Sequence, residues 1–204
     1  MDSFTRSFLL LFVLLNPFIM SVYLLDVVQA LDKRAFARQL LRAGAISLVV
    51  FLLFAWAGDA IFEDVLQVSF HAFLIFGGIT FLIIGTRLIL GLGPPVESLR
   101  PDKGDVSASI AMPFIVGPGT ISASVLAGTR LAPIPAATSI ALALAAAIVA
   151  ILVFKWLHDY ARAHHEGFVH RYAEIAGRVA ALFTGSFAIE MIMTGVEGWL
   201  ETLT

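Results

Sequence analysis

The sequence predicts an all-α integral membrane protein of six transmembrane helices, arranged as two inverted-topology repeats of three helices. Three observations predict this fold: long apolar segments, basic residues gathered in alternate loops, and a proline-centred interruption in the first and fourth segments. The chain has 204 residues, of which 59% are hydrophobic and only 14% are charged, and its mean hydropathy is +0.93. A soluble domain carries roughly a quarter charged residues, so the composition excludes an ordinary soluble protein.

The apolar segments are long enough to cross a bilayer, which takes about 20 mostly apolar residues. The first segment lacks the small-residue cleavage site of a signal peptide, so we expect it to remain as a span. We expect one transmembrane domain over residues 1–204, built from a first repeat (1–92), a cytoplasmic link (93–106) and a second repeat (107–204). The predicted spans are residues 4–27, 41–62, 68–92, 107–128, 136–157 and 176–200.

Basic residues predict the orientation of these spans. Eleven of the thirteen Lys and Arg residues fall in or beside the segments that follow the first, third and fifth spans. Basic loops remain on the cytoplasmic side. Both termini are therefore expected outside the cytoplasm, and Lys155 is assigned to the cytoplasmic segment after the fifth span.

The first and fourth spans share a short internal repeat. Residues 14–21 can be laid on residues 115–122 so that the prolines (Pro17, Pro118) and the serines (Ser21, Ser122) coincide. Each motif interrupts the first span of a three-span unit, and three is odd, so the second unit enters the membrane from the opposite face. Interrupted spans at matching places in inverted halves are the best sequence indication of a transporter's substrate site.

The residues at the two interruptions predict where each helix restarts. Asn16 is a good N-cap and proline a good first helical residue, so a half-helix is expected to begin at Pro17. The second interruption contains Gly117, Pro118 and Gly119, and proline removes a backbone donor and breaks the helix. The two half-helix N-termini would meet near the midplane and present free N–H groups and positive dipole ends, which suit a carboxylate. The expected substrate-binding residues are Asn16, Pro17, Phe18, Ser21, Gly117, Pro118, Gly119, Thr120, Ile121 and Ser122. The alternative is a pair of kinks packed on each other.

An acidic residue lies deep in the sixth predicted span. Glu190 forms a polar stripe with Ser186 and Thr194, four residues to either side. A carboxyl group at membrane depth is costly and is usually functional or paired. It is expected to bind a substrate ammonium group or a coupling Na⁺ or H⁺, with Thr80 of the third span as a further cavity residue. A structural hydrogen bond or an outward-pointing side chain is the alternative for Glu190.

Other classes of function find little support in the sequence. There is no cysteine, which excludes disulfides and thiolate chemistry, and no basic run with interleaved aromatic residues that would indicate nucleic acid. The histidines at 158, 164, 165 and 170 lack zinc-binding spacing, so no metal or other cofactor is expected. No Ser–His pair or paired aspartate lies at membrane depth, and we expect the protein not to be an enzyme.

Taken together, these residues resemble the MarC family, also known as the neutral amino acid transporter or SnatA-like family. The resemblance covers nearly the whole chain. It rests on Asn16-Pro17, on Phe76-Gly77-Gly78-Ile79 with Gly85, on residues 105–122 with Pro113 and Gly117-Pro118-Gly119-Thr120, and on Gly177, Glu190 and Gly195. It implies a six-span protein of the bacterial or archaeal plasma membrane that moves small neutral amino acids such as alanine, glycine, serine or threonine.

Two places depart from the family pattern. Phe18-Ile19-Met20-Ser21-Val22 stands where the family has a Gly and then a Pro, and Glu190 stands where an uncharged polar residue such as Gln is expected. Both lie in the expected cavity and bear on the substrate more than on the fold. The leading hypothesis is a secondary transporter with alternating access, working as a monomer or an oligomer. An uncoupled channel or exporter and a non-transporting membrane partner protein remain the alternatives.

Overall fold

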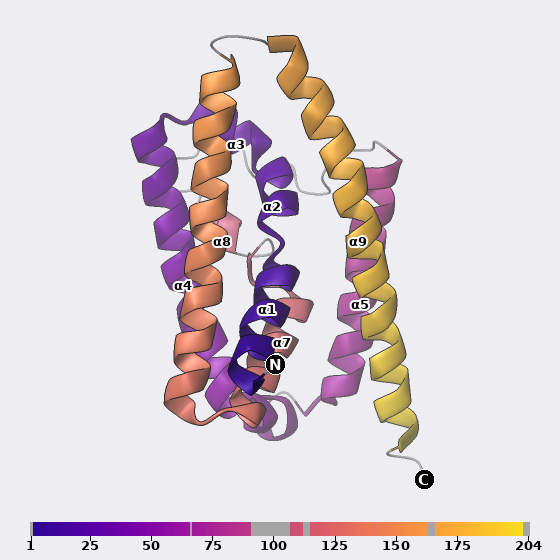
Figure 1. The fold of residues 1–204 in the computed structure, drawn as a ribbon. Coiled ribbons are helices and arrows are strands. Elements are labelled where there is room, and N and C mark those ends of the chain that lie inside the picture. The colour runs from indigo at the N-terminus through magenta and orange to yellow at the C-terminus, as the bar shows by residue number, and fades with distance from the viewer. Residues whose placement is uncertain (1, 66, 91–106, 112–114, 163–165, 202–204) are drawn as a thin grey trace.

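The computed structural model describes residues 2–65, 67–90, 107–111, 115–162 and 166–201. These residues are helical apart from short connections (Figure 1). The predicted link 93–106 and Pro113 lie outside the described residues. The helices are α1 (Ser3–Leu15), α2 (Pro17–Tyr23), α3 (Leu25–Ala30), α4 (Lys33–Ala60), the π-helical turn η1 (Ile61–Val65), α5 (Phe70–Ile89), α6 (Ser107–Ile110), α7 (Pro118–Arg130), α8 (Pro133–Arg162) and α9 (Glu166–Glu201).

Acidic caps fix two helix starts. The Asp2 carboxylate accepts a hydrogen bond from the Thr5 N–H at 3.2 Å, and bonding to Thr5 lowers the pKa of the Asp2 carboxyl group. Asp32 caps α4 in the same way through the Ala35 N–H at 2.9 Å. Helix α4 therefore begins at Lys33, eight residues before the predicted span, because a side-chain cap starts a helix ahead of its apolar stretch.

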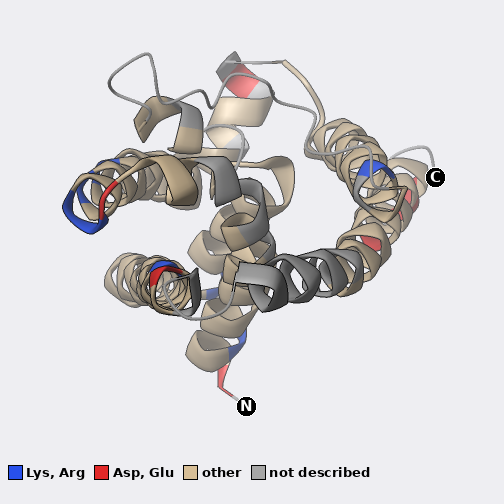
Figure 2. Ribbon diagram, turned by 90° about the horizontal axis from the view of Figure 1, so that it is seen from above, with Lys and Arg blue, Asp and Glu red and all other residues tan. Residues whose placement is uncertain are grey.

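The helices form two groups that lie side by side (Figures 1 and 2). Helix α1 packs against α7 and α8, while α4 also contacts both of these helices, and α5 and α9 form a close pair. The buried centre of the first group includes Leu11 of α1, Leu24 beside α3, and Phe36 and Phe51 of α4. Both chain ends lie toward the same end of the molecule, the lower one in Figure 1.

Small residues allow α5 and α9 to approach closely. A Cβ atom added at Gly78 would lie 2.6 Å from the Ala188 carbonyl oxygen, and one at Gly195 would lie 2.8 Å from the His71 carbonyl oxygen. Only glycine fits at such distances. Close backbone approach through small residues is the usual way in which membrane helices associate.

The outer surface of the helices is strongly apolar. Phe76 is 67% exposed and Ile134 is 78% exposed, and many other large apolar side chains share this exposure. Within the described residues, Lys33–Gly58, Phe70–Arg87 and Pro133–Tyr160 are long and apolar enough to cross a membrane. An apolar exterior of this extent suits lipid rather than water. The chain is therefore a helical membrane protein.

Candidate functional site

The first helix break depends on one residue with a left-handed backbone conformation. Asn16 has φ 41° and ψ 72°, a conformation that asparagine tolerates better than most residues. Its N–H donates to the Phe12 carbonyl at 3.1 Å and ends α1, and its own carbonyl accepts from the Met20 N–H at 3.0 Å. Helix α2 begins at Pro17, as the sequence predicts. Asn16 is thus the C-cap of α1, and its carbonyl is the first hydrogen-bond acceptor of α2.

The second break is held by a hydroxyl group. Gly117 is extended (φ −125°, ψ 171°), and α7 begins at Pro118, inside the interruption at residues 117–119 rather than after it. The Thr120 hydroxyl accepts a hydrogen bond from the Gly117 N–H at 2.9 Å and lies within donating distance of the Ile115 and Gly117 carbonyls, at 2.8 Å and 3.0 Å. Thr120 is only 2% exposed. Its hydroxyl therefore acts as an internal cap for backbone groups that the break would otherwise leave unpaired.

The two half-helices start near mid-height and run in opposite directions, α2 upward and α7 downward (Figure 1). Their starts are close in space, because a Cβ atom at Gly119 would lie 3.6 Å from the Leu14 side chain. The backbone ladders begin with the Met20 and Ile121 amides. The amides at positions 18, 19, 119 and 120 precede these ladders, as the first amides of any helix do.

Equivalent serines make equivalent bonds after the two prolines. The Ser21 hydroxyl donates to the Pro17 carbonyl at 2.7 Å, and the Ser122 hydroxyl donates to the Pro118 carbonyl at 2.8 Å. Ser21 is 1% exposed, whereas Ser122 is half-buried. Each hydroxyl has one hydrogen, and in both helices the backbone uses it. These side chains can therefore act only as acceptors toward a ligand in this conformation.

Side chains fill the space beside the second break. A Cβ atom at Gly77 of α5 would overlap the Pro118 ring, and one at Gly119 would lie 3.1 Å from the Phe81 ring and 3.4 Å from the Met191 sulfur. Gly117 and Ile121 are also buried. At the first break, Phe18 is 40% exposed. The first break is thus the more open of the two in this conformation.

The predicted coupling residues lie elsewhere on α9 and α5. Ala188 and Ile192 of α9 face α5, whereas Glu190, Ser186 and Thr194 are exposed. Residue 190 is about 200° around the helix from residue 188, so this stripe points away from α5. On α5, Thr80 is likewise about 200° around the helix from Gly78, which faces α9. The Thr80 hydroxyl donates to the Phe76 carbonyl at 2.9 Å. The structure therefore does not bring the three α9 residues to the breaks, whereas Thr80 is half-buried and lies one turn from Gly77, which meets Pro118.

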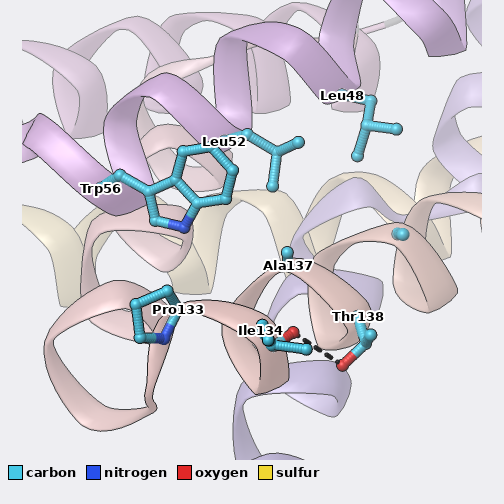
Figure 3. A pocket seen from close by; sticks show the side chains of 8 residues that line it. Leu48, Leu52, Trp56, Pro133, Ile134, Ala137 and Thr138 are labelled. Atoms are coloured by element: carbon cyan, nitrogen blue, oxygen red, sulfur yellow. Dashed lines mark hydrogen bonds between the residues drawn. The ribbon is translucent and has the colours of Figure 1, made fainter.

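An open groove of about 340 Å³ lies between α4 and α8 (Figure 3). Thr138 supplies a hydroxyl to its lining, and this hydroxyl donates within α8 to the Ile134 carbonyl at 3.1 Å. None of the lining residues belongs to either break, and an apolar groove is a poor site for a zwitterion. The lining residues are Leu48, Leu52, Trp56, Pro133, Ile134, Ala137, Thr138 and Ala141.

Sequence reasoning missed a buried charged cluster on α8. The sequence assigned Lys155 to the cytoplasmic segment at the end of the fifth span, but α8 continues to Arg162, and Lys155 and His158 are only 5% and 6% exposed. The Lys155 ammonium lies 2.8 Å from a carboxylate oxygen of Asp159. The spacing of four residues between opposite charges was the signal available in the sequence. No group of three or more metal-ligating side chains occurs in the part of the chain described.

Apolar helices, a lipid-compatible surface and two broken helices with opposed starts define a helical integral membrane protein. The family model described as MarC family integral membrane protein matches residues 1–200, and the chain belongs to this family. It is similar to a UPF0056 membrane protein of Pyrococcus horikoshii, with 26% identity over 164 residues, 78% of this chain and 76% of the relative. A UPF0056 membrane protein of Pyrococcus abyssi is 31% identical over 158 residues, 74% of this chain and 73% of the relative. No solved structure matches.

Proposed function

We propose that this protein is a secondary transporter that moves a small neutral amino acid, or a similar small zwitterion, across the plasma membrane by alternating access. The observation that carries the proposal is the meeting of two half-helix starts, at Pro17 and Pro118, inside an apolar helical protein. Irregular backbone at membrane depth is tolerated where it is buried in protein or lines a cavity. No catalytic chemistry is proposed for the chain.

The substrate carboxylate is assigned to the backbone at the two breaks. The amides of Phe18 and Ile19 on α2, and of Gly119 and Thr120 on α7, precede the helical ladders and carry the positive ends of two helix dipoles. Hydroxyl groups are not the donors, because Ser21, Thr120 and Ser122 give their hydrogens to backbone carbonyls. Ser122, which is half-buried, is placed to accept a hydrogen bond from the substrate ammonium group.

The proposed topology is six spans in two inverted repeats, residues 1–92 and 107–204, with both termini outside the cytoplasm of a bacterial or archaeal cell. The half-helix starts at Pro17 and Pro118, which coincide when residues 14–21 are laid on residues 115–122, support the repeat. Glu190 is retained as a proposed site for the coupling Na⁺ or H⁺, reached from the exposed face of α9 together with Ser186 and Thr194. Transport then requires α9 to change its neighbours during the cycle.

The test is uptake and efflux of labelled alanine, serine and threonine by proteoliposomes, with the wild type compared with Gly119→Leu. The larger side chain meets Phe81 and Met191 and covers the α7 amides, so flux should fall by about tenfold or more, as expected when a required backbone contact is blocked. Gly185→Leu is the matched control, since nothing lies within 4 Å of a Cβ atom there. Equal flux from wild type and folded Gly119→Leu overturns the site.

A non-transporting membrane partner protein is the second candidate, favoured by the close packing around Gly119. A transporter in an occluded state has the same packing. The proteoliposome assay separates the two, because a partner protein gives no saturable flux of any amino acid in either direction. An uncoupled channel or exporter gives flux that neither saturates nor responds to a pH or Na⁺ gradient.

A further inference from the structure

A partly buried ionic cluster links helix α8 to α3, the short helix that follows the first half-helix α2. The Lys155 ammonium donates to the backbone carbonyl of Val28, in α3, as well as to the Asp159 carboxylate. Val28 is itself fully buried. A cation on the last carbonyls of a helix gains from the helix dipole as well as from the hydrogen bond. Lys155 therefore holds the segment that begins at Pro17, the first break.

One ring nitrogen of the neighbouring histidine has no hydrogen bond. The Nδ1 atom of His158 is buried and has no hydrogen-bond partner among the described residues. It lies 3.7 Å from the same Asp159 oxygen that accepts from Lys155. When the neutral imidazole carries its hydrogen on Nε2, its Nδ1 presents a lone pair to that oxygen and cannot bond it. The protonated imidazolium carries a hydrogen on both nitrogens, so Nδ1 can then donate to Asp159. One carboxylate oxygen thus lies between two groups that can compete for it.

We propose that His158, with Asp159 and Lys155, forms a proton-binding site that controls how firmly α3 is held to α8. A proton from water binds Nδ1, and the imidazolium then bonds Asp159. The cluster changes from neutral to a net charge of plus one. Repulsion between the ammonium and the imidazolium favours withdrawal of the flexible Lys155 side chain toward water, which frees the Val28 carbonyl and loosens α3.

Other charged groups near this end of α8 come from the elements packed against it. Helix α4 runs antiparallel to α8 here, and its start contributes the exposed residues Asp32, Lys33, Arg34 and Arg38, with the Asp32 carboxylate bonded to the Ala35 N–H. The side chains of Asp26 on α3 and of the first turns of α9 lie outside the described residues. Asp159 is thus the described carboxylate within reach of both cations. The proton-controlled contact between α8 and α3 does not rest on the proposed transport function.

The absence of cysteine from the chain allows a direct test. Val28→Cys keeps the backbone carbonyl that Lys155 binds, and its thiol reacts with a water-soluble maleimide only when α3 separates from its neighbours. Gln29→Cys, at an exposed position, corrects for the effect of pH on thiol reactivity. The measured quantity is the labelling rate of Val28→Cys divided by that of Gln29→Cys, in lipid nanodiscs without substrate.

The ratio should rise by about tenfold or more when the pH is lowered from about 8 to about 6, since a charge-assisted hydrogen bond is lost. His158→Gln should keep the ratio low at both pH values, and Asp159→Asn should keep it high at both. His71→Gln, a control near the opposite end of the molecule, should respond as the wild type does. A constant wild-type ratio, or a pH response retained in His158→Gln, overturns the proposal.

Flux in proteoliposomes of the same variants separates this proposal from the proposed function. A pH-dependent labelling ratio without amino acid flux keeps the proton site and rejects transport. Flux with a pH-independent ratio rejects the proton site and keeps transport.

Discussion

The two helix breaks occupy matching places in the sequence but are built differently. At the first, the chain turns through the left-handed backbone of Asn16 (φ 41°). At the second, Gly117 is extended and the Thr120 hydroxyl bonds the buried N–H of Gly117, which the break would otherwise leave unpaired. In the alignment of the two motifs Ile19 occupies the place of Thr120, and isoleucine has no hydroxyl to offer. The first break therefore depends on backbone conformation and the second on a side-chain hydrogen bond.

The breaks also differ in how they are packed. The second is enclosed by α5, α9 and α1, with Gly77 against the Pro118 ring and with Phe81, Met191 and Leu14 around Gly119. Phe18 at the first break is 40% exposed. Phe18 stands where the second motif has Gly119, and from this the sequence predicts that the second break holds a ligand more closely. In this conformation neighbouring side chains take the space that the missing Cβ atom leaves.

The largest expected effect comes from adding one methyl group beside the second break. Gly77→Ala should lower the free energy of unfolding by close to 3 kcal/mol, the upper end of overpacking costs of about 1–3 kcal/mol, because the new Cβ atom meets the rigid Pro118 ring. Gly185→Ala, where nothing lies within 4 Å, should be neutral or stabilising by up to about 1 kcal/mol. Thermal unfolding in detergent measures both. Equal midpoints for the two variants contradict the close packing assigned to the second break.

Removing the hydroxyl at the second break should have the next largest effect. Thr120→Val keeps the shape of the side chain but leaves the Gly117 N–H without its bond in a buried site, at a cost of about 2 kcal/mol. Thr129→Val on the same helix is the control, because the Thr129 hydroxyl bonds the Leu126 carbonyl at an exposed position. Its unfolding midpoint should stay near that of the wild type. If Thr129→Val loses as much free energy of unfolding as Thr120→Val, the Thr120 hydroxyl is not what distinguishes the second break from the first.

The smallest effect tests the backbone conformation of the first break. Asn16→Ala and Asn16→Gly both lose the amide side chain, so their difference isolates the left-handed backbone. Alanine should be less stable than glycine by about 1 kcal/mol, since a Cβ atom is unfavourable at positive φ. Thermal unfolding of the pair, with the wild type as reference, gives this difference. If alanine equals or exceeds glycine in stability, the left-handed turn is not what holds the first break.

Local chemistry explains why the sequence predicted the helices and both breaks. Proline lacks a backbone donor, so Pro17 and Pro118 start helices whatever surrounds them. Long apolar runs likewise predict membrane helices from composition alone. The helix limits were predicted less well: α4 starts earlier than its apolar residues because of the Asp32 cap, and α8 extends past Lys155 to Arg162. Charged residues can continue a helix beyond its apolar core.

Only the tertiary structure decided which side chains meet. Helical spacing correctly places Glu190, Ser186 and Thr194 on one stripe, yet spacing cannot say which side of α9 faces α5. The close contacts of Gly78 and Gly195 fix that rotation and leave the stripe exposed. In the same way, the Lys155–Val28 contact joins residues 127 positions apart. The sequence alone determined a broken-helix membrane protein, because helix formation and breakage are local; the neighbours of each break depend on the packing of distant helices.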